Sequence, residues 1–157
     1  SDTQGRSSYR EVYCDSVEWI KAGTVDYICP QLYWSIGYEV ADFEVLVNWW
    51  QQVAATSDVA LYIGIGAYRA AEAEPGDTWY GTEELQRQLD LLDRSIDIQG
   101  EVFISYSSLQ NIDGCADMLR THYTGTKQPD NNTDNNMQQN TLLDLMGRFI
   151  ASLFCAS

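Results

Sequence analysis

Segments of helical period alternate along this chain with short apolar runs. In the helical segments apolar residues recur every three or four positions, which predicts helices with one buried face. We predict helices over residues 8–22, from 43 onward, from 82 onward and over 113–123. The apolar runs predict strands over residues 25–29, 59–64 and 101–105. Gly23 fits the end of the first helix, and Asp42 and Asp113 fit helix N-caps.

The centres of the predicted strands, Tyr27, Tyr62 and Phe103, are 35 and 41 residues apart. This is the spacing of strand–helix units in a parallel sheet, so the pattern predicts an α/β fold. The connections that follow the strands are long and polar, whereas those that precede them are short. Because the loops after parallel strands lie at one edge of the sheet, we expect functional residues at that edge.

The run from Val25 to Trp34 is the most informative stretch of the chain. It starts as a predicted buried strand and reaches Pro30, where we expect regular sheet pairing to stop. Gln31, Tyr33 and Trp34 follow directly. An amide and aromatic rings at the carboxyl end of a strand suit a sugar, which offers hydroxyls and C–H faces. The alternative is a buried strand that ends in a proline turn with core aromatics.

Each predicted strand is followed by candidate ligand-binding side chains. Gln31 could hydrogen-bond a sugar hydroxyl or an acetamido group, and Tyr33 with Trp34 could form a stacking platform. After the second strand come Tyr68 and Arg69, whose guanidinium could bind a carboxylate or pair with a loop glutamate. Ser105 ends the third strand, either as a contact to ligand or as a hydroxyl inside the sheet.

Composition narrows the classes of partner. The 157 residues fit one domain of ordinary size, and 9 basic against 23 acidic residues give a net charge of −14. Nucleic acids and anionic membranes need a basic surface, so we expect neither as a partner. No apolar run reaches the length of about 18 residues that spans a bilayer. From residue 126 the sequence changes: 126–140 is interpreted as a polar linker or disordered segment, and 141–157 as an amphipathic helix.

The cysteines and the one histidine offer little reactive chemistry. The four cysteines have no metal-type spacing, and we interpret them as structural thiols in preference to disulfides or catalytic thiols: Cys14, Cys29, Cys115 and Cys155. His122 has no second ligand near it in sequence, so we predict no metal site and no cofactor.

Residues 1–125 resemble the C-terminal part of the glycosyl-hydrolase-like family related to family 10, whose members are (β/α)8 barrels. The motifs that carry the resemblance lie within 1–9, 19–34, 41–50, 61–69 and 119–123. It implies that the three strands are the sixth to eighth of a barrel. Thr24 stands where an aromatic is usual, and Ile104 where phenylalanine usually precedes Ser105.

The resemblance implies a glycoside hydrolase of the bacterial cell envelope or a secreted one, acting on a polysaccharide such as peptidoglycan glycan strands. The chain would be a fragment that supplies one side of the substrate cleft. Two alternatives stay open, a non-catalytic carbohydrate-binding module and an inactive half-barrel fragment. Because three parallel strands leave two open edges, self-association through them is also expected.

Glycoside hydrolysis generally needs two carboxyl groups. The family's acidic motif, at the end of the fourth barrel strand, would lie before Ser1, so we expect the main catalytic acids outside this chain. Glu39 is the candidate that remains within it, because Asp42 and Asp113 are interpreted as N-caps. Glu72 and Glu74 are interpreted as solvated side chains.

Overall fold

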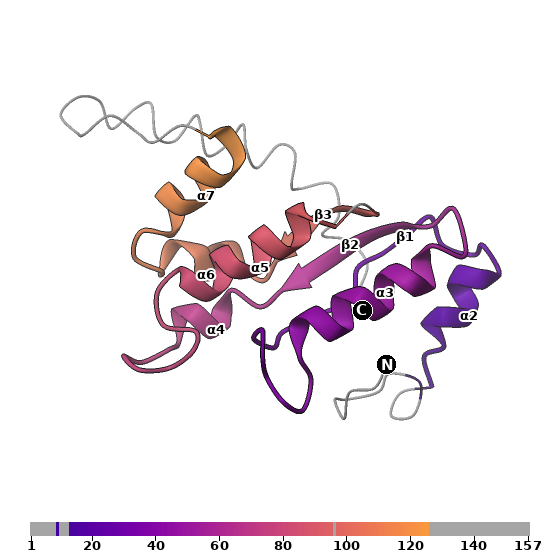
Figure 1. The fold of residues 1–157 in the computed structure, drawn as a ribbon, viewed down its shortest axis with the longest axis horizontal. Coiled ribbons are helices and arrows are strands. Elements are labelled where there is room, and N and C mark those ends of the chain that lie inside the picture. The colour runs from indigo at the N-terminus through magenta and orange to yellow at the C-terminus, as the bar shows by residue number, and fades with distance from the viewer. Residues whose placement is uncertain (1–8, 10–12, 96, 126–157) are drawn as a thin grey trace. The chain divides into compact units, whose positions relative to one another are not determined.

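A computed structural model describes residue 9, residues 13–95 and residues 97–125 (Figure 1). Three strands, β1 (Tyr27–Ile28), β2 (Ala60–Ile65) and β3 (Ile98–Phe103), pair in parallel in the order β1-β2-β3. The described helices are α2 (Ser16–Lys21), α3 (Phe43–Ala54), α4 (Tyr68–Ala71), α5 (Glu83–Asp93), α6 (Tyr106–Gln110) and α7 (Cys115–Thr124). This confirms the α/β class with a parallel sheet. The predicted linker over 126–140 and helix over 141–157 lie outside the described residues.

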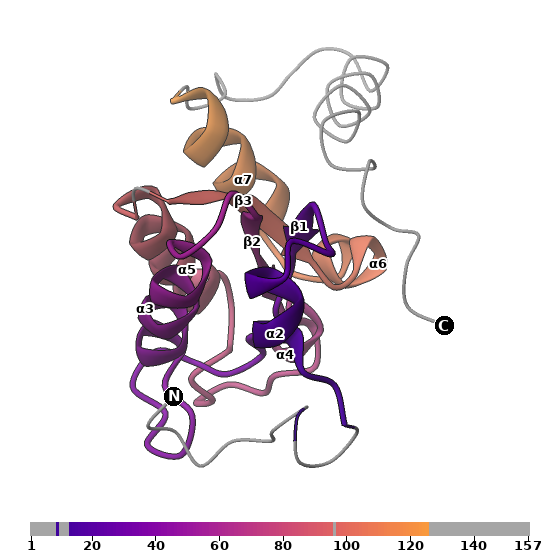
Figure 2. The same cartoon turned by 90° about the vertical axis from the view of Figure 1, so that its right-hand side faces the viewer.

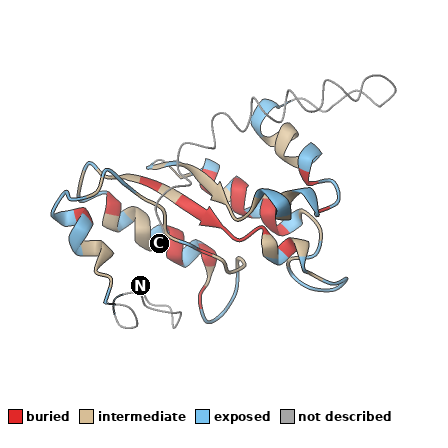
Figure 3. Ribbon diagram, turned by 180° about the vertical axis from the view of Figure 1, so that it is seen from behind, coloured by how far each residue is buried: buried red, intermediate tan, exposed pale blue. Residues whose placement is uncertain are grey.

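The hydrophobic core lies between the sheet and the two long helices α3 and α5, which cover the same face of the sheet (Figures 1 and 2). Leu61, Ile63 and Ile65 alternate along β2 and are at most 1% exposed. Against them pack Phe43 of α3 and Leu85 of α5, both fully buried. Strand β2 is the most buried of the three, as Figure 3 shows in red. A parallel strand covered on one face by helices needs this apolar pattern.

The prediction of a buried first strand over 25–29 was wrong. The paired segment β1 is only Tyr27–Ile28, and the Tyr27 side chain is 43% exposed. Tyr27 lies on the sheet face that α3 and α5 do not cover, where its ring meets Tyr62 edge to face at 6.0 Å. Within the described residues β1 pairs on one side alone, with β2, and an edge strand keeps more of its surface exposed.

Pro30 does not end the pairing, contrary to the prediction. The Gly64 amide donates to the Pro30 carbonyl at 2.9 Å, and the Leu32 amide donates to the Gly64 carbonyl at 2.9 Å. Gln31 therefore stands opposite Gly64, in the same parallel register as Ile28 opposite Leu61. Proline lacks a donor but keeps its carbonyl, so the ladder passes through the acceptor. The chain therefore continues to pair with β2 as far as Gln31 and Leu32.

The predicted first helix, 8–22, was too long. Tyr13 has a left-handed backbone, with φ of 55°, and α2 begins only at Ser16, after Asp15 caps the Glu18 amide. Its end at Gly23, which has φ of 62°, is confirmed. Asp42 is confirmed as the N-cap of α3 through a bond of 3.0 Å from the Val45 amide. Asp113 is not an N-cap: Gly114 holds that position.

The third strand begins earlier than predicted, at Ile98 in place of Glu101. Leu61 faces Ile98 while Tyr62 faces Gly100, so one extra residue of β3 forms an irregularity between them. This interrupts the alternation that would identify a strand from sequence. The single-turn helices α4 and α6 were not predicted. In the described part of the chain, no helix is both long and apolar enough to cross a bilayer.

Candidate functional site

The loops after the three strands meet at the carboxyl edge of the sheet, near α4 and α6 (Figure 1). The first loop approaches β2 closely because Gly64 has no side chain: a Cβ there would lie 3.0 Å from the Pro30 carbonyl oxygen. The end of β2 joins the end of β3 through the Tyr68 amide, which donates to the Ile104 carbonyl at 3.0 Å. Backbone contacts therefore place the three strand ends side by side.

Tyr33 packs into this edge between Gly66 and Tyr68. A Cβ on Gly66 would lie 3.0 Å from the Tyr33 Cβ, so the glycine makes room for the ring. The Tyr33 and Tyr68 rings meet edge to face with centroids 5.7 Å apart. Burial, together with Cys29 and Tyr68 nearby, raises the pKa of Tyr33 to about 12. The phenol stays protonated at neutral pH and keeps its hydrogen-bond donor.

Arg69 follows Tyr68 and is exposed. Its guanidinium carbon lies 5.7 Å from the centroid of the Tyr68 ring. Among the described residues it forms no ion pair, so the alternative of a salt bridge to a loop glutamate is not seen there. A cation that rests near a ring and faces water can still accept an anionic group of a ligand.

A hollow of about 470 Å³ opens at these loops. Three of the predicted site residues line it: Trp34, Tyr68 and Arg69. Two further aromatic residues line it that the sequence analysis did not select, Tyr38 and Trp79. The remaining lining residues are polar or small: Ser35, Glu72, Ala73, Asp77 and Thr78. The aromatic content of the long loop over 67–81 was the available signal for Trp79.

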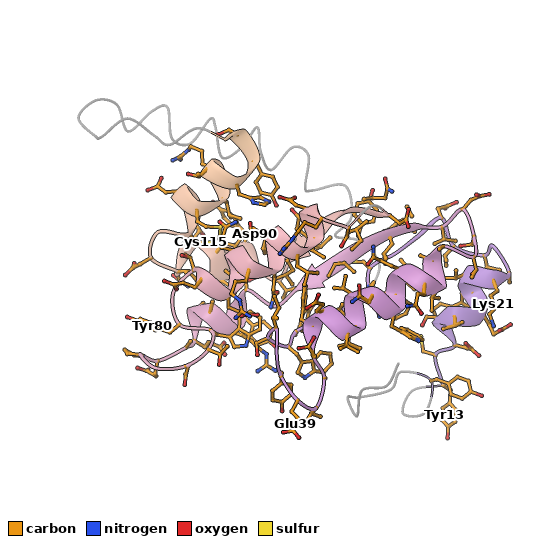
Figure 4. All side chains as sticks on the ribbon, in the orientation of Figure 1. Tyr13, Lys21, Glu39, Tyr80, Asp90 and Cys115 are labelled. Carbon is orange, nitrogen blue, oxygen red and sulfur yellow. The ribbon has the colours of Figure 1, made fainter. Side chains whose placement is uncertain are left out.

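The four other predicted residues do not line this hollow, and of these Tyr33 packs beside it against Tyr68. Gln31 is exposed at its bridge to β2. Ser105 caps α6, with its hydroxyl oxygen 3.4 Å from the Ser108 amide and 2.8 Å from the Ser107 hydroxyl. Glu39 is exposed near the tip of the loop between β1 and α3 and points outward (Figure 4). The structure thus groups Tyr33, Trp34, Tyr68 and Arg69 and leaves the other three apart.

The carboxylates in the hollow are Glu72 and Asp77. Both are exposed, and the Asp77 carboxylate accepts a bond of 3.0 Å from the Glu74 amide, which stabilises the local turn. Indole and phenol rings with a guanidinium and acids at their margin can stack on a sugar and hydrogen-bond its hydroxyls. Burial raises the pKa of Cys29 and of Cys115 to about 11, so neither of these two thiols is a nucleophile at neutral pH.

A carboxyl group with a strongly raised pKa lies elsewhere. Burial, and then the charge of Asp93, raises the pKa of Glu101 to about 7. Glu101 stands opposite Ile63 in the register, on the face that the helices cover, and accepts a hydrogen bond from the Tyr123 hydroxyl of α7. Nearby, the His122 Nε2 lies 3.7 Å from an Asp93 carboxylate oxygen. Glu101 therefore joins α7 to the sheet and does not line the hollow.

A larger hollow, of about 600 Å³, lies between α3 and α5. Its lining mixes both signs of charge with amides, including Glu44, Asn48, Gln51, Arg87 and Arg94. Most of its lining comes from the surfaces of α3 and α5, and the loop after β1 contributes Ile36. In parallel sheets ligands bind at the carboxyl ends of the strands, so we take the smaller hollow as the candidate site.

Comparison with known proteins identifies the family of the chain. A family described as glycosyl hydrolase-like 10 matches residues 2–81. Glycosyl hydrolase DigH from Escherichia coli strain K12 is 40% identical over 108 residues, which are 65% of this chain and 24% of that protein. Glycosyl hydrolase YngK from Bacillus subtilis strain 168 is 37% identical over 119 residues, or 74% of this chain and 23% of that protein. The chain spans about a quarter of the length of these relatives. By its match over about half of its residues, the chain belongs to the glycosyl hydrolase-like 10 family.

Proposed function

We propose that this chain forms one side of the substrate cleft of a glycoside hydrolase. In this proposal β1, β2 and β3 are the sixth to eighth strands of a (β/α)8 barrel. Membership of the family and the parallel order of the strands support it. Within the described residues β1 and β3 each pair on one side alone, which suits edges that contact further strands or another copy of the chain.

The aromatic hollow at the strand ends is the observation that carries the proposal. Trp34, Tyr38, Tyr68 and Trp79 supply ring faces around a space of about 470 Å³, which suits one or two sugar rings. The proposed substrate is a polysaccharide of the bacterial cell envelope, and the proposed location is the envelope or the outside of the cell. The carboxylates in the hollow are exposed, so we propose that the catalytic acids come from another part of the barrel.

Replacing Trp34 by alanine should weaken glycan binding about tenfold, because loss of a stacking indole removes about 1.4 kcal/mol. The probe is the soluble β-1,4-linked tetramer of N-acetylglucosamine, titrated calorimetrically against the full chain. Trp34→Phe should retain part of the affinity. The matched control is Trp19→Ala, since Trp19 lies on α2, is 45% exposed and does not line the hollow.

Equal affinities for Trp34→Ala and Trp19→Ala would contradict the proposal, provided that circular dichroism shows both variants folded. A longer chain that contains a complete barrel would distinguish a glycoside hydrolase from a non-catalytic carbohydrate-binding module. Release of reducing ends from the tetramer supports a hydrolase, whereas binding without cleavage supports a carbohydrate-binding module.

Replacing Arg69 by alanine should weaken binding of a carboxylate-bearing glycan by tenfold or more and leave a neutral one within twofold. A charge-assisted hydrogen bond contributes about 1.5 to 3 kcal/mol, and Arg69 offers the guanidinium at the hollow. The two probes are the N-acetylglucosamine tetramer and a tetrasaccharide in which N-acetylglucosamine alternates with N-acetylmuramic acid. Arg94→Ala is the control, since Arg94 is the exposed C-cap residue of α5 and does not line this hollow. Equal losses for both probes would exclude carboxylate recognition by Arg69.

A further inference from the structure

Two polar residues of α5 are buried where an apolar face would be expected. Glu84 is 1% exposed and Gln88 is fully buried, next to the core residues Leu85 and Leu89. Burial of a carboxylate and an amide costs several kcal/mol unless hydrogen bonds replace the lost water. Their contacts therefore show what the pair does in the fold.

Both side chains bind the backbone of the loop after β1. A Glu84 carboxylate oxygen, Oε1, accepts a bond of 2.7 Å from the Ile36 amide. The Gln88 Nε2 donates to the Trp34 carbonyl at 3.1 Å and to the same Glu84 oxygen at 2.9 Å. The pair thus contacts Trp34, which lines the hollow, and Ile36, two positions further along the chain. These links connect positions 48 and 54 apart in the chain.

The orientation of the Gln88 amide is determined by its partners. Its nitrogen faces two acceptors, so its oxygen must point away, and that oxygen has no hydrogen-bond partner among the described residues. An unsatisfied buried oxygen costs about 1 to 3 kcal/mol. Two apolar residues at these positions would avoid that cost, so the pair is better explained by the position it gives to the loop than by stability alone.

We propose that Glu84 and Gln88 are positioning residues for the candidate site, which hold the 34–36 segment so that the Trp34 indole faces the glycan. The inference rests on the proposed function. Glu84 and Gln88 do not line the hollow, so neither touches the ligand. The second oxygen of Glu84 binds Arg87 at 2.9 Å, and Arg87 is 54% exposed, so this ion pair points toward solvent and does not contact the 34–36 segment.

The test compares Glu84→Ala, Glu84→Gln and the control Arg87→Ala in the full chain. Hydrogen exchange of the Ile36 amide should become at least tenfold faster in Glu84→Ala, while amides of β2 keep their protection. Affinity for the N-acetylglucosamine tetramer should fall fivefold to tenfold in the same variant. Glu84→Gln keeps an oxygen that can accept from Ile36 and should stay within threefold of the parent chain in both measurements, as should Arg87→Ala.

Unchanged exchange at Ile36 in Glu84→Ala would overturn the proposal, and so would an equal loss of protection along β2, which indicates a general structural role. If Glu84→Ala fails to fold, Gln88→Leu replaces it, because leucine fills a similar volume and removes the bond to the Trp34 carbonyl. This variant should weaken tetramer binding at least threefold, and unchanged affinity overturns the inference. If the parent chain does not bind the tetramer, the proposed function fails, whereas exchange at Ile36 still reports whether Glu84 holds the loop.

Discussion

Phe43→Ala is expected to lower the free energy of unfolding by about 3 to 5 kcal/mol. Phe43 is fully buried at the first position of α3 and is among the largest buried side chains of the core. Its truncation removes aromatic contacts and leaves a cavity that a packed core fills incompletely. Urea unfolding followed by tryptophan fluorescence measures the change.

The matched control for Phe43 is on the same helix. Val45 is 44% exposed, and its replacement by alanine should change the free energy of unfolding by less than about 0.5 kcal/mol. Phe43 also follows the Asp42 cap, whose second carboxylate oxygen accepts from the Gly37 amide. Core packing and the loop that carries Trp34 therefore depend on the same end of α3. A loss below about 1 kcal/mol for Phe43→Ala would contradict this arrangement.

The second large effect is a pH dependence that disappears in Glu101→Gln. Because burial and Asp93 raise the pKa of Glu101 from 4.5 to about 7, the native state holds this proton more tightly than the unfolded state. The stabilisation is fully present below pH 4.5 and is lost as the pH rises through 7. Its size is about 2 kcal/mol once partial solvent exposure is allowed for.

The measurement is the difference in unfolding free energy between the parent chain and Glu101→Gln at pH 4.5 and pH 8.5. Glutamine keeps an oxygen that can accept from Tyr123, so the comparison removes the titrating proton and retains the contact. Asp93, whose charge contributes to the raised pKa of Glu101, is kept in both proteins, as is His122. From pH 4.5 to pH 8.5, the unfolding free energy of the variant should rise by about 2 kcal/mol relative to that of the parent chain. A constant difference would show that Glu101 keeps an ordinary pKa.

Local sequence patterns predicted the parallel sheet and the edge at which the loops meet. The strand spacing is set by the length of each strand–helix unit, and Asp42 caps a helix through contacts within three residues. A local signal could have corrected the continuation of the predicted first helix through residues 13–15, because Asp15 followed by Glu18 is a helix start signal. The apolar spacing upstream of Asp15 outweighed that signal in the prediction.

Contacts between distant segments could not be read from the sequence. Glu84 lies in the first turn of α5, where a carboxylate is common at the surface, yet it accepts a hydrogen bond from the Ile36 amide, 48 positions away in the chain. Nothing local distinguishes a buried glutamate from a solvated one in an amphipathic segment. The exposure of Tyr27 likewise depends on the place of β1 at the edge of the sheet. Helices of one turn, such as α4, are too short to show a period.

Mapping the bound glycan by NMR would examine the glycan-binding surface most directly. The N-acetylglucosamine tetramer would be titrated into the ¹⁵N-labelled chain while backbone and indole signals are followed. The largest shifts should fall on Trp34, Tyr68, Arg69 and Trp79, with both indole N–H signals affected. Shifts confined to Asn48, Gln51 and Arg94 between α3 and α5, or none at millimolar tetramer, would contradict a sugar-binding edge at the strand ends.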